Sequence, residues 1–71
     1  MIYAITLKVY EPANMYELPI RVREKMIDEH GNLKLGYQSF ETEMSQEEFE
    51  EIMLWFANNE SIAKVIGVEK R

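Results

Sequence analysis

The chain has no cysteine, and it has only three glycines and two prolines among its 71 residues. Without cysteine it can form no disulfide, no thiolate nucleophile and no cysteine-ligated zinc site. Its glycines are isolated from one another, so there is no glycine-rich loop of the kind that cradles phosphates. These absences argue against several classes of enzyme site and favour a reducing compartment, and we therefore expect a cytoplasmic protein.

Long apolar runs are also missing. The longest mostly apolar run lies at the N-terminus, is interrupted by Lys8, and is far shorter than the roughly 20 residues that a membrane span needs. It also lacks the basic start of a signal peptide. We expect no membrane partner and a single domain over residues 1–71. Because so small a core gains stability from self-association, we also expect a homodimer.

Basic residues are absent between Lys34 and Lys64. That stretch contains Glu41, Glu43, Glu47, Glu48, Glu50, Glu51 and Glu60. It therefore carries a charge of −7 within a total of −5, and the remaining residues sum to +2. Nucleic-acid binding depends on neutralising phosphates with Lys and Arg. The charge distribution thus predicts no direct nucleic-acid partner and favours a basic protein surface.

Alternation of apolar and polar residues predicts strands over residues 2–10 and 18–27. In the first, one face carries Tyr3, Ile5, Leu7 and Val9. In the second, one face carries Ile20, Val22 and Met26, and the other carries Arg21, Arg23 and Lys25. Between the two strands, Pro12 and Asn14 indicate a change of chain direction within residues 11–17.

A hairpin is expected next, with a polar turn at residues 28–32 leading into a strand over 33–43. Gly31 suits the positive φ that such a turn requires. Pairing Ile27 with Asn32 keeps the apolar side chains of both strands on one face. After Ser39 the apolar phase changes, which indicates a bulge or a strand end.

A helix should begin at Ser45, because Ser45 and Glu48 have the spacing of a capping box. Its apolar stripe consists of Phe49, Ile52, Met53 and Phe56. A last strand is expected over residues 62–70. The predicted fold is α+β: a four-stranded, mainly antiparallel sheet with one helix packed on one face, in the order βββαβ.

Catalytic and metal-binding residues are not evident. His30 is the only histidine, and neither an orienting partner nor a set of ligands is suggested around it. The acidic residues at the start of the helix are most simply a solvated helix face. We expect no cofactor, no metal and no enzymatic activity.

The helix carries apolar residues that a one-sided core does not need. Leu54 projects away from the stripe among Glu47 and Glu51, and Trp55 projects to its flank. An apolar anchor inside a charged rim is typical of an interface. The alternative for Trp55 is that it covers a loop or the end of the sheet.

A second binding surface is conceivable at the basic side chains of residues 21, 23 and 25. Tyr3, Tyr10, Tyr16 and Tyr37 could stack on bases. Together these residues would suit single-stranded nucleic acid. A solvated outer face is the alternative, because Glu24 lies within the basic run and the acidic half opposes phosphate.

The stretch MSQEEFEE, preceded by the predicted hairpin and followed by a strand ending in KVIGVEKR, resembles the small uracil-DNA glycosylase inhibitors of Bacillus phages. Those proteins are acidic dimers that imitate DNA, and the resemblance implies that Phe49 and Glu50 contact the partner. Phage inhibitors of the host nucleoid protein HU share the small size and the acidity. The expected partner-binding residues are Glu41, Glu43, Glu47, Phe49, Glu50, Glu51, Leu54 and Trp55.

The function expected from these features is that of a small acidic interaction module. It would mimic DNA and occupy the DNA-binding surface of a host nucleoid-associated protein or DNA glycosylase, in the host cytoplasm if it is phage-encoded. The alternative is a regulatory or structural subunit that assembles through exposed apolar residues, with the acids supplying solubility.

Overall fold

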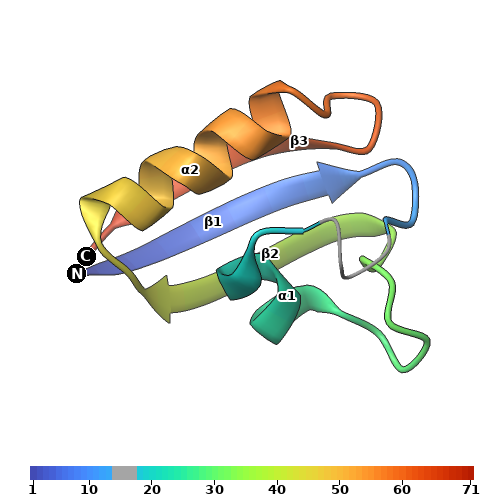
Figure 1. The fold of residues 1–71 in the computed structure, drawn as a ribbon, viewed down its shortest axis with the longest axis horizontal. Coiled ribbons are helices and arrows are strands. Elements are labelled where there is room, and N and C mark those ends of the chain that lie inside the picture. Colours follow the sequence, from blue (N-terminus) through green and yellow to red (C-terminus); the bar gives the residue numbers. More distant parts are fainter. Residues whose placement is uncertain (14–17) are drawn as a thin grey trace.

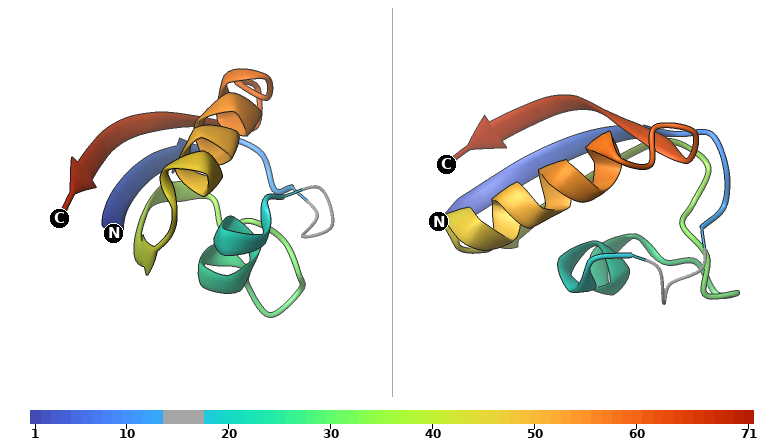
Figure 2. Two further views of the ribbon diagram at one scale, coloured as in Figure 1. Left: turned by 60° about the vertical axis from the view of Figure 1, so that its left-hand side comes forward. Right: turned by 45° about the horizontal axis from the view of Figure 1, so that its top comes forward.

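The computed structural model describes residues 1–13 and 18–71 as a three-stranded antiparallel sheet and two helices. In chain order the elements are β1 (Ile2–Val9), α1 (Ile20–Met26), β2 (Gly36–Glu43), α2 (Gln46–Ala57) and β3 (Ala63–Lys70). The strands lie in the order β2-β1-β3 (Figure 1). Both helices cover one face of the sheet and leave the other face open (Figure 2). The expected change of direction at residues 11–17 includes Asn14 and Tyr16, which lie outside the described residues.

The central strand β1 supplies the middle of the core. Its burial alternates along the strand, as the sequence predicted. The buried side chains are Tyr3, Ile5, Leu7 and Val9. Residues directly opposite one another in an antiparallel pair share a face. The open face is therefore built from Ala4, Thr6 and Lys8 of β1 and their neighbours on β2 and β3.

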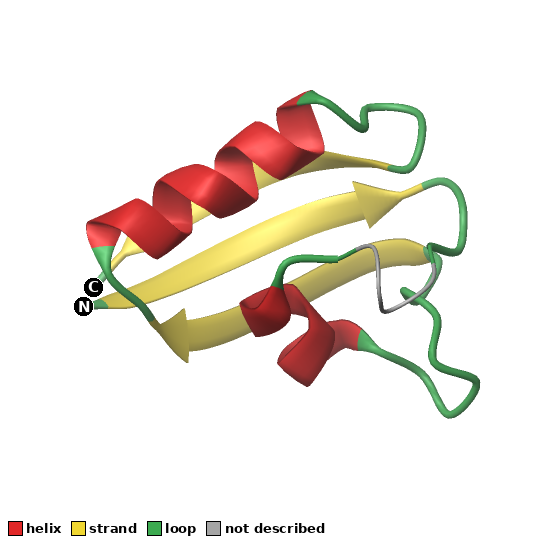
Figure 3. Cartoon of the chain, in the orientation of Figure 1, coloured by secondary structure: helices red, strands yellow, loops and turns green. Residues whose placement is uncertain are grey.

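The prediction of four strands and one helix is wrong, because residues 20–26 form the helix α1 (Figure 3). Its buried residues Val22 and Met26 are four apart, a spacing that fits both a strand of period two and one face of a helix. A strand would also have buried Ile20, which is 59% exposed. Pro19 occupies the N-cap, where its missing N–H costs nothing.

The predicted hairpin reduces to one isolated bridge between Ile27 and Leu33, so the register of Ile27 with Asn32 is also wrong. The turn itself forms as expected, with Gly31 at φ 78°. The Asp28 carboxylate accepts hydrogen bonds from the backbone N–H groups of Asn32 and His30. The bond from Asn32 contributes most to lowering the pKa of Asp28.

Strand β2 starts three residues later than expected, at Gly36, whose φ is 87°. The bulge or strand end expected after Ser39 is absent, because β2 continues to Glu43 and pairs with β1 without interruption. The irregularity lies instead in the pairing of β1 with β3, between Thr6 and Leu7. Phe40 is buried opposite Ile5, so the change of apolar phase after Ser39 reflects the true inward face of β2.

Helix α2 begins as predicted. Ser45 and Glu48 form the capping box. The side chains of Ile52 and Phe56 are buried in the core between α2 and the sheet. Phe49 and Met53 pack against the same core while remaining partly exposed. The last predicted strand is confirmed as β3. The two termini lie together at one end of the sheet (Figure 1), where the Arg71 N–H donates to the Ile2 carbonyl at 2.8 Å.

Candidate functional site

The acidic residues of the sequence are divided among different surfaces. Glu41 and Glu43 belong to β2 and stand opposite Ala4 and Ile2, which places them on the open face of the sheet. The exposed glutamates of α2 belong to the layer on the other side of the sheet (Figure 2). The predicted partner-binding residues therefore do not form one continuous site.

Glu41 lies in a charged cluster at one end of the open face. The Arg71 guanidinium donates hydrogen bonds to the carboxylates of both Glu41 and Glu69. The pKa of Arg71 is raised, first by the hydrogen bond to Glu69 and then by the charge of Glu41. Because a cation already accompanies Glu41, it is a weaker attraction for a basic partner than an unpaired carboxylate.

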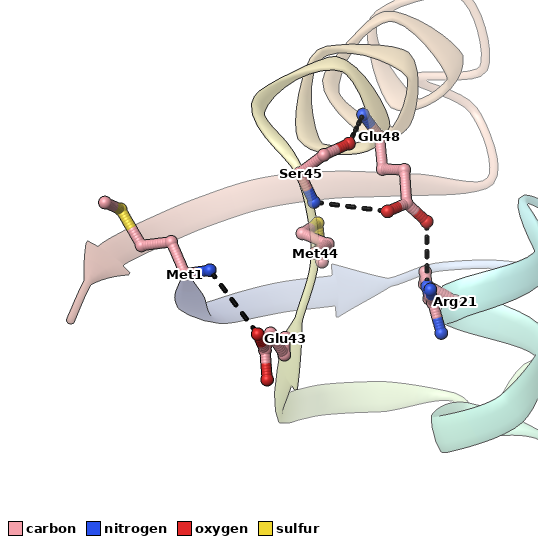
Figure 4. Close-up of a pocket in the computed structure, with 6 residues that line it drawn as sticks. All are labelled: Met1, Arg21, Glu43, Met44, Ser45 and Glu48. Atoms are coloured by element: carbon pink, nitrogen blue, oxygen red, sulfur yellow. Dashed lines mark hydrogen bonds and ion pairs between the residues drawn. The ribbon is translucent and has the colours of Figure 1, made fainter.

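A hollow of about 530 Å³ opens at the start of α2 (Figure 4). Its lining consists of Met1, Arg21, Glu43, Met44, Ser45 and Glu48. The Ser45 hydroxyl accepts from the Glu48 backbone N–H at 3.1 Å, and the Glu48 carboxylate accepts from the Ser45 N–H at 3.1 Å. Glu43 lies 3.9 Å from the N-terminal amine of Met1. The polar groups around this hollow thus bind mainly one another.

Arg21 connects the two helices across this hollow. Its Nε donates to Glu48 Oε2 at 2.9 Å, and its guanidinium also lies 3.6 Å from Glu24. The hydrogen bond to Glu48 is the main reason that the pKa of Arg21 is raised, and the same bond lowers the pKa of Glu48. Glu48 therefore holds α1 against α2, and the side chain of Arg21 is not available as a free basic site.

The outward side of α2 gathers four of the predicted residues into one surface. We call Glu47, Glu50, Glu51 and Leu54 the α2 acidic face; all four are exposed. Their spacing of three and four residues places them along one side of the helix. Leu54 is 62% exposed, and α2 contains no basic residue. Three carboxylates with an apolar side chain at their end thus face outward together.

Phe49 and Trp55 lie at the margins of the core. The Phe49 ring stacks on Tyr3 with centroids 4.2 Å apart and an angle of 9° between the planes. Trp55 meets Phe56 edge-on at 5.1 Å and 88°. Both residues pack against the core while keeping part of their surface exposed. Their first role is to hold α2 on the sheet.

Two exposed groups are formed by residues that the sequence did not place together, although it did indicate Tyr10 and Tyr37 as possible stacking residues. Ile20 of α1 lines a small hollow of about 70 Å³ together with Glu51, which extends the α2 acidic face with a second apolar residue. On the open face, the Lys8 ammonium lies 5.5 Å from the ring centre of Tyr10 and 5.3 Å from that of Tyr37. The alternation of residues 2–10 already placed Lys8 and Tyr10 together, but the position of Tyr37 depends on the pairing of β1 with β2.

Metal-binding clusters of three or more His, Cys, Asp or Glu residues are absent from residues 1–13 and 18–71. His30 is exposed in its turn, 3.5 Å from the Glu29 carboxylate. Within the same described residues, neither helix has the length and apolar character needed to cross a membrane.

Comparison of the chain with protein-family models, curated proteins and solved structures gave no match.

Proposed function

We propose that this protein is a small, non-enzymatic interaction module whose α2 acidic face binds the basic, DNA-binding surface of another protein and so competes with DNA. One observation carries the proposal. Helix α2 presents Glu47, Glu50 and Glu51 outward, has no basic residue of its own, and ends this row of charges with the exposed Leu54.

Carboxylates three and four residues apart on a helix have Cβ atoms about 5–6 Å apart. Phosphates follow one another along a nucleic-acid strand at a comparable spacing, so a groove lined by Lys and Arg meets a similar row of anions. The negative field would speed the encounter with such a groove, and Leu54, at the end of the row of carboxylates, would be buried against the partner as an apolar anchor.

The partner class follows from the charge and from the resemblance to phage inhibitors. A nucleoid-associated protein of the HU type or a DNA glycosylase offers a basic surface shaped for DNA. Both classes work in the cytoplasm, where a protein without cysteine is well suited to act. The proposed module would occupy that surface directly and would not bind DNA.

The test is competition for a fluorescently labelled DNA duplex bound to an HU-type protein or to a uracil-DNA glycosylase. The α2 variant carries Glu47→Lys, Glu50→Lys and Glu51→Lys. The matched control carries Glu11→Lys, Glu24→Lys and Glu29→Lys, which are also exposed. Both variants change the net charge from −5 to +1, since each of the three substitutions adds +2.

We expect the unaltered protein and the control to displace the duplex from one of the two partners, and the α2 variant to fail. The affinity of the unaltered protein for that partner, measured without DNA, should fall as salt is added, because charges at an exposed surface are screened. Equal displacement by the two triple variants would show that net charge alone matters and would refute the α2 acidic face. Failure of the unaltered protein to displace DNA from either partner would refute DNA mimicry.

Single-stranded nucleic-acid binding is a second candidate, and one observation favours it. Tyr10 and Tyr37 are 50% and 69% exposed on either side of Lys8, which suits stacking of bases. Fluorescence anisotropy with labelled single-stranded oligonucleotides tests it. Binding that is lost in Tyr37→Ala would support this candidate, and absence of binding by the unaltered protein would exclude it.

A further inference from the structure

Strand β3 has a neighbour on one side only. It pairs with β1, and no other strand among the described residues lies along its outer edge (Figure 1). Six of its eight residues are exposed, including Ile66 at 49% and Val68 at 46%. The unpaired N–H and C=O groups of such an edge are a ready template for another strand.

The irregular pairing of β3 with β1 gives this edge a symmetric arrangement of side chains. Along β1, Lys64 stands opposite Lys8, Gly67 opposite Thr6, and Glu69 opposite Ala4. Thr6 is midway between Ala4 and Lys8, so the bulge places Gly67 midway between Lys64 and Glu69 on the open face. Ile66 is the extra residue of this bulge and has no partner on β1. Val65 and Val68 pair with Leu7 and Ile5, on either side of Thr6, so they lie equally far along the strand from Gly67 and on the helix-covered face.

We infer that this edge binds the same edge of a second copy of the chain. The two β3 strands run antiparallel around a two-fold axis at Gly67 and join the two sheets into one sheet of six strands. In this register Lys64 of each copy lies opposite Glu69 of the other, and Val65 of each lies opposite Val68 of the other. Because the contact is two-fold symmetric, each favourable pair occurs twice in the dimer.

The charged groups are available for these pairs. Lys64 makes no ion pair with any other part of the chain that the structure describes. Arg71 binds Glu69 through Oε2, which leaves Oε1 able to accept from a lysine. Directly opposite charges stabilise an antiparallel pair, and directly opposite like charges destabilise it.

A groove beside β3 can receive the apolar side chains of this contact. A groove of about 220 Å³ runs between α2 and β3. Its lining is Met53, Phe56, Ala57, Glu60, Lys64 and Val65. Since Val68 of the second copy lies beside Val65, its side chain enters this groove. Two half-exposed valines are thereby removed from water at each end of the contact.

Other pairings lack these advantages. Moving the two-fold axis along β3 to Val65 or Val68 removes both Lys–Glu pairs. The other edge of the sheet, β2, carries Glu41 and Glu43 and no basic residue. Self-pairing through β2 therefore brings together no opposite charges in any register.

The test exchanges the two charges and measures mass by sedimentation equilibrium, from about 10 µM to about 1 mM. The variants are Lys64→Glu, Glu69→Lys and the double variant with both changes. Glu41→Lys is the control for Glu69→Lys, because it also removes a partner of Arg71 and alters the same sheet face. Lys25→Glu, at an exposed position of α1, is the control for Lys64→Glu.

We expect the unaltered chain and both controls to reach twice the monomer mass of 8.4 kDa. Each single exchange should raise the dissociation constant by about tenfold or more, and the double exchange should restore it to within about threefold. A monomeric unaltered chain would overturn the inference. So would dimers that both single variants leave intact, or a double variant that stays monomeric while folded. The readout is independent of any DNA-binding partner, so it can fail without affecting the proposed function.

Discussion

Two aliphatic residues on α2, only two positions apart, should respond very differently to truncation. Ile52 is 1% exposed and Leu54 is 62% exposed. The substitutions Ile52→Ala and Leu54→Ala remove the same number of carbon atoms and both introduce the best helix former. A difference in stability between the two variants therefore measures which side of α2 faces the sheet.

The size of the difference follows from burial. Truncating a buried isoleucine to alanine costs about 2–5 kcal/mol, from lost transfer free energy and from the cavity that remains. A domain of this length has a total stability of roughly 4–11 kcal/mol, at about 0.05–0.15 kcal/mol per residue. Ile52→Ala should thus remove a large fraction of the free energy of unfolding, whereas Leu54→Ala should change it by about 0.5 kcal/mol or less.

Thermal unfolding followed by circular dichroism measures both variants. With about 4–8 °C per kcal/mol for a domain of this size, Ile52→Ala should lower Tm by at least about 8 °C, and Leu54→Ala by about 4 °C or less. Melts are compared at one protein concentration, because association would make Tm depend on concentration. Equal decreases would refute the orientation of α2, and with it the assignment of Leu54 to the α2 acidic face.

Three further substitutions test local interactions. The hydrogen bond from Arg21 is the main reason that the pKa of Glu48 is lowered. The ionised carboxylate therefore stabilises the fold above its ordinary pKa of 4.5, and this stability is lost as pH falls through the lower folded value. The free energy of urea unfolding should depend less on pH in this acid range for Glu48→Gln than for the unaltered chain. Ser45→Ala should cost about 1 kcal/mol in urea unfolding, with Ser45→Asp restoring most of it. Gly36 has a positive φ and open space around it, so Gly36→Ala should cost about 1–2 kcal/mol from the backbone alone; an unchanged midpoint would contradict that strain.

Helix α2 and strands β1 and β3 could be predicted because their local signals agree with their environment. The capping box at Ser45 has one interpretation only, and the apolar stripe of α2 has no match to a strand. In β1 the two faces meet a core and an open surface, so alternation is preserved. In α2 and β1 one face is buried and the other is exposed, which is the condition that makes periodicity informative. Strand β3 is mostly exposed, and its β-branched residues predict it instead.

The pattern of residues 18–27 is ambiguous, because Leu18, Val22 and Met26 recur every four residues, which is also a multiple of two. Two positions could have decided between the patterns. A strand would bury Glu24, and it would bury Ile20, which lies on the exposed side of α1. With α1 assigned correctly, the hairpin loses its first strand, and the sheet loses its fourth.

The candidate surfaces depended on topology in the same way. A run of charge along the sequence does not show that Glu41 and Glu47 belong to different layers, nor that Arg71 returns to Glu41 from the other end of the chain. The spacing along α2 did identify Glu47, Glu51 and Leu54, because a helix turns a local pattern into a surface. The edge of β3 required the register with β1 and its bulge.

The proposed dimer and the proposed role of the α2 acidic face have a combined consequence that net charge alone does not predict. A two-fold axis perpendicular to the joined sheet would keep both α2 helices on the same side, so the proposed dimer would present two acidic faces to one partner surface. Two linked contacts bind more tightly than one. Lys64→Glu makes each chain more negative by two charges, which by charge alone should strengthen competition with DNA. If the dimer is the competing species, the same substitution should instead weaken competition by about tenfold or more, and adding Glu69→Lys should restore it. Stronger competition by Lys64→Glu would show that the module acts as a monomer through its charge.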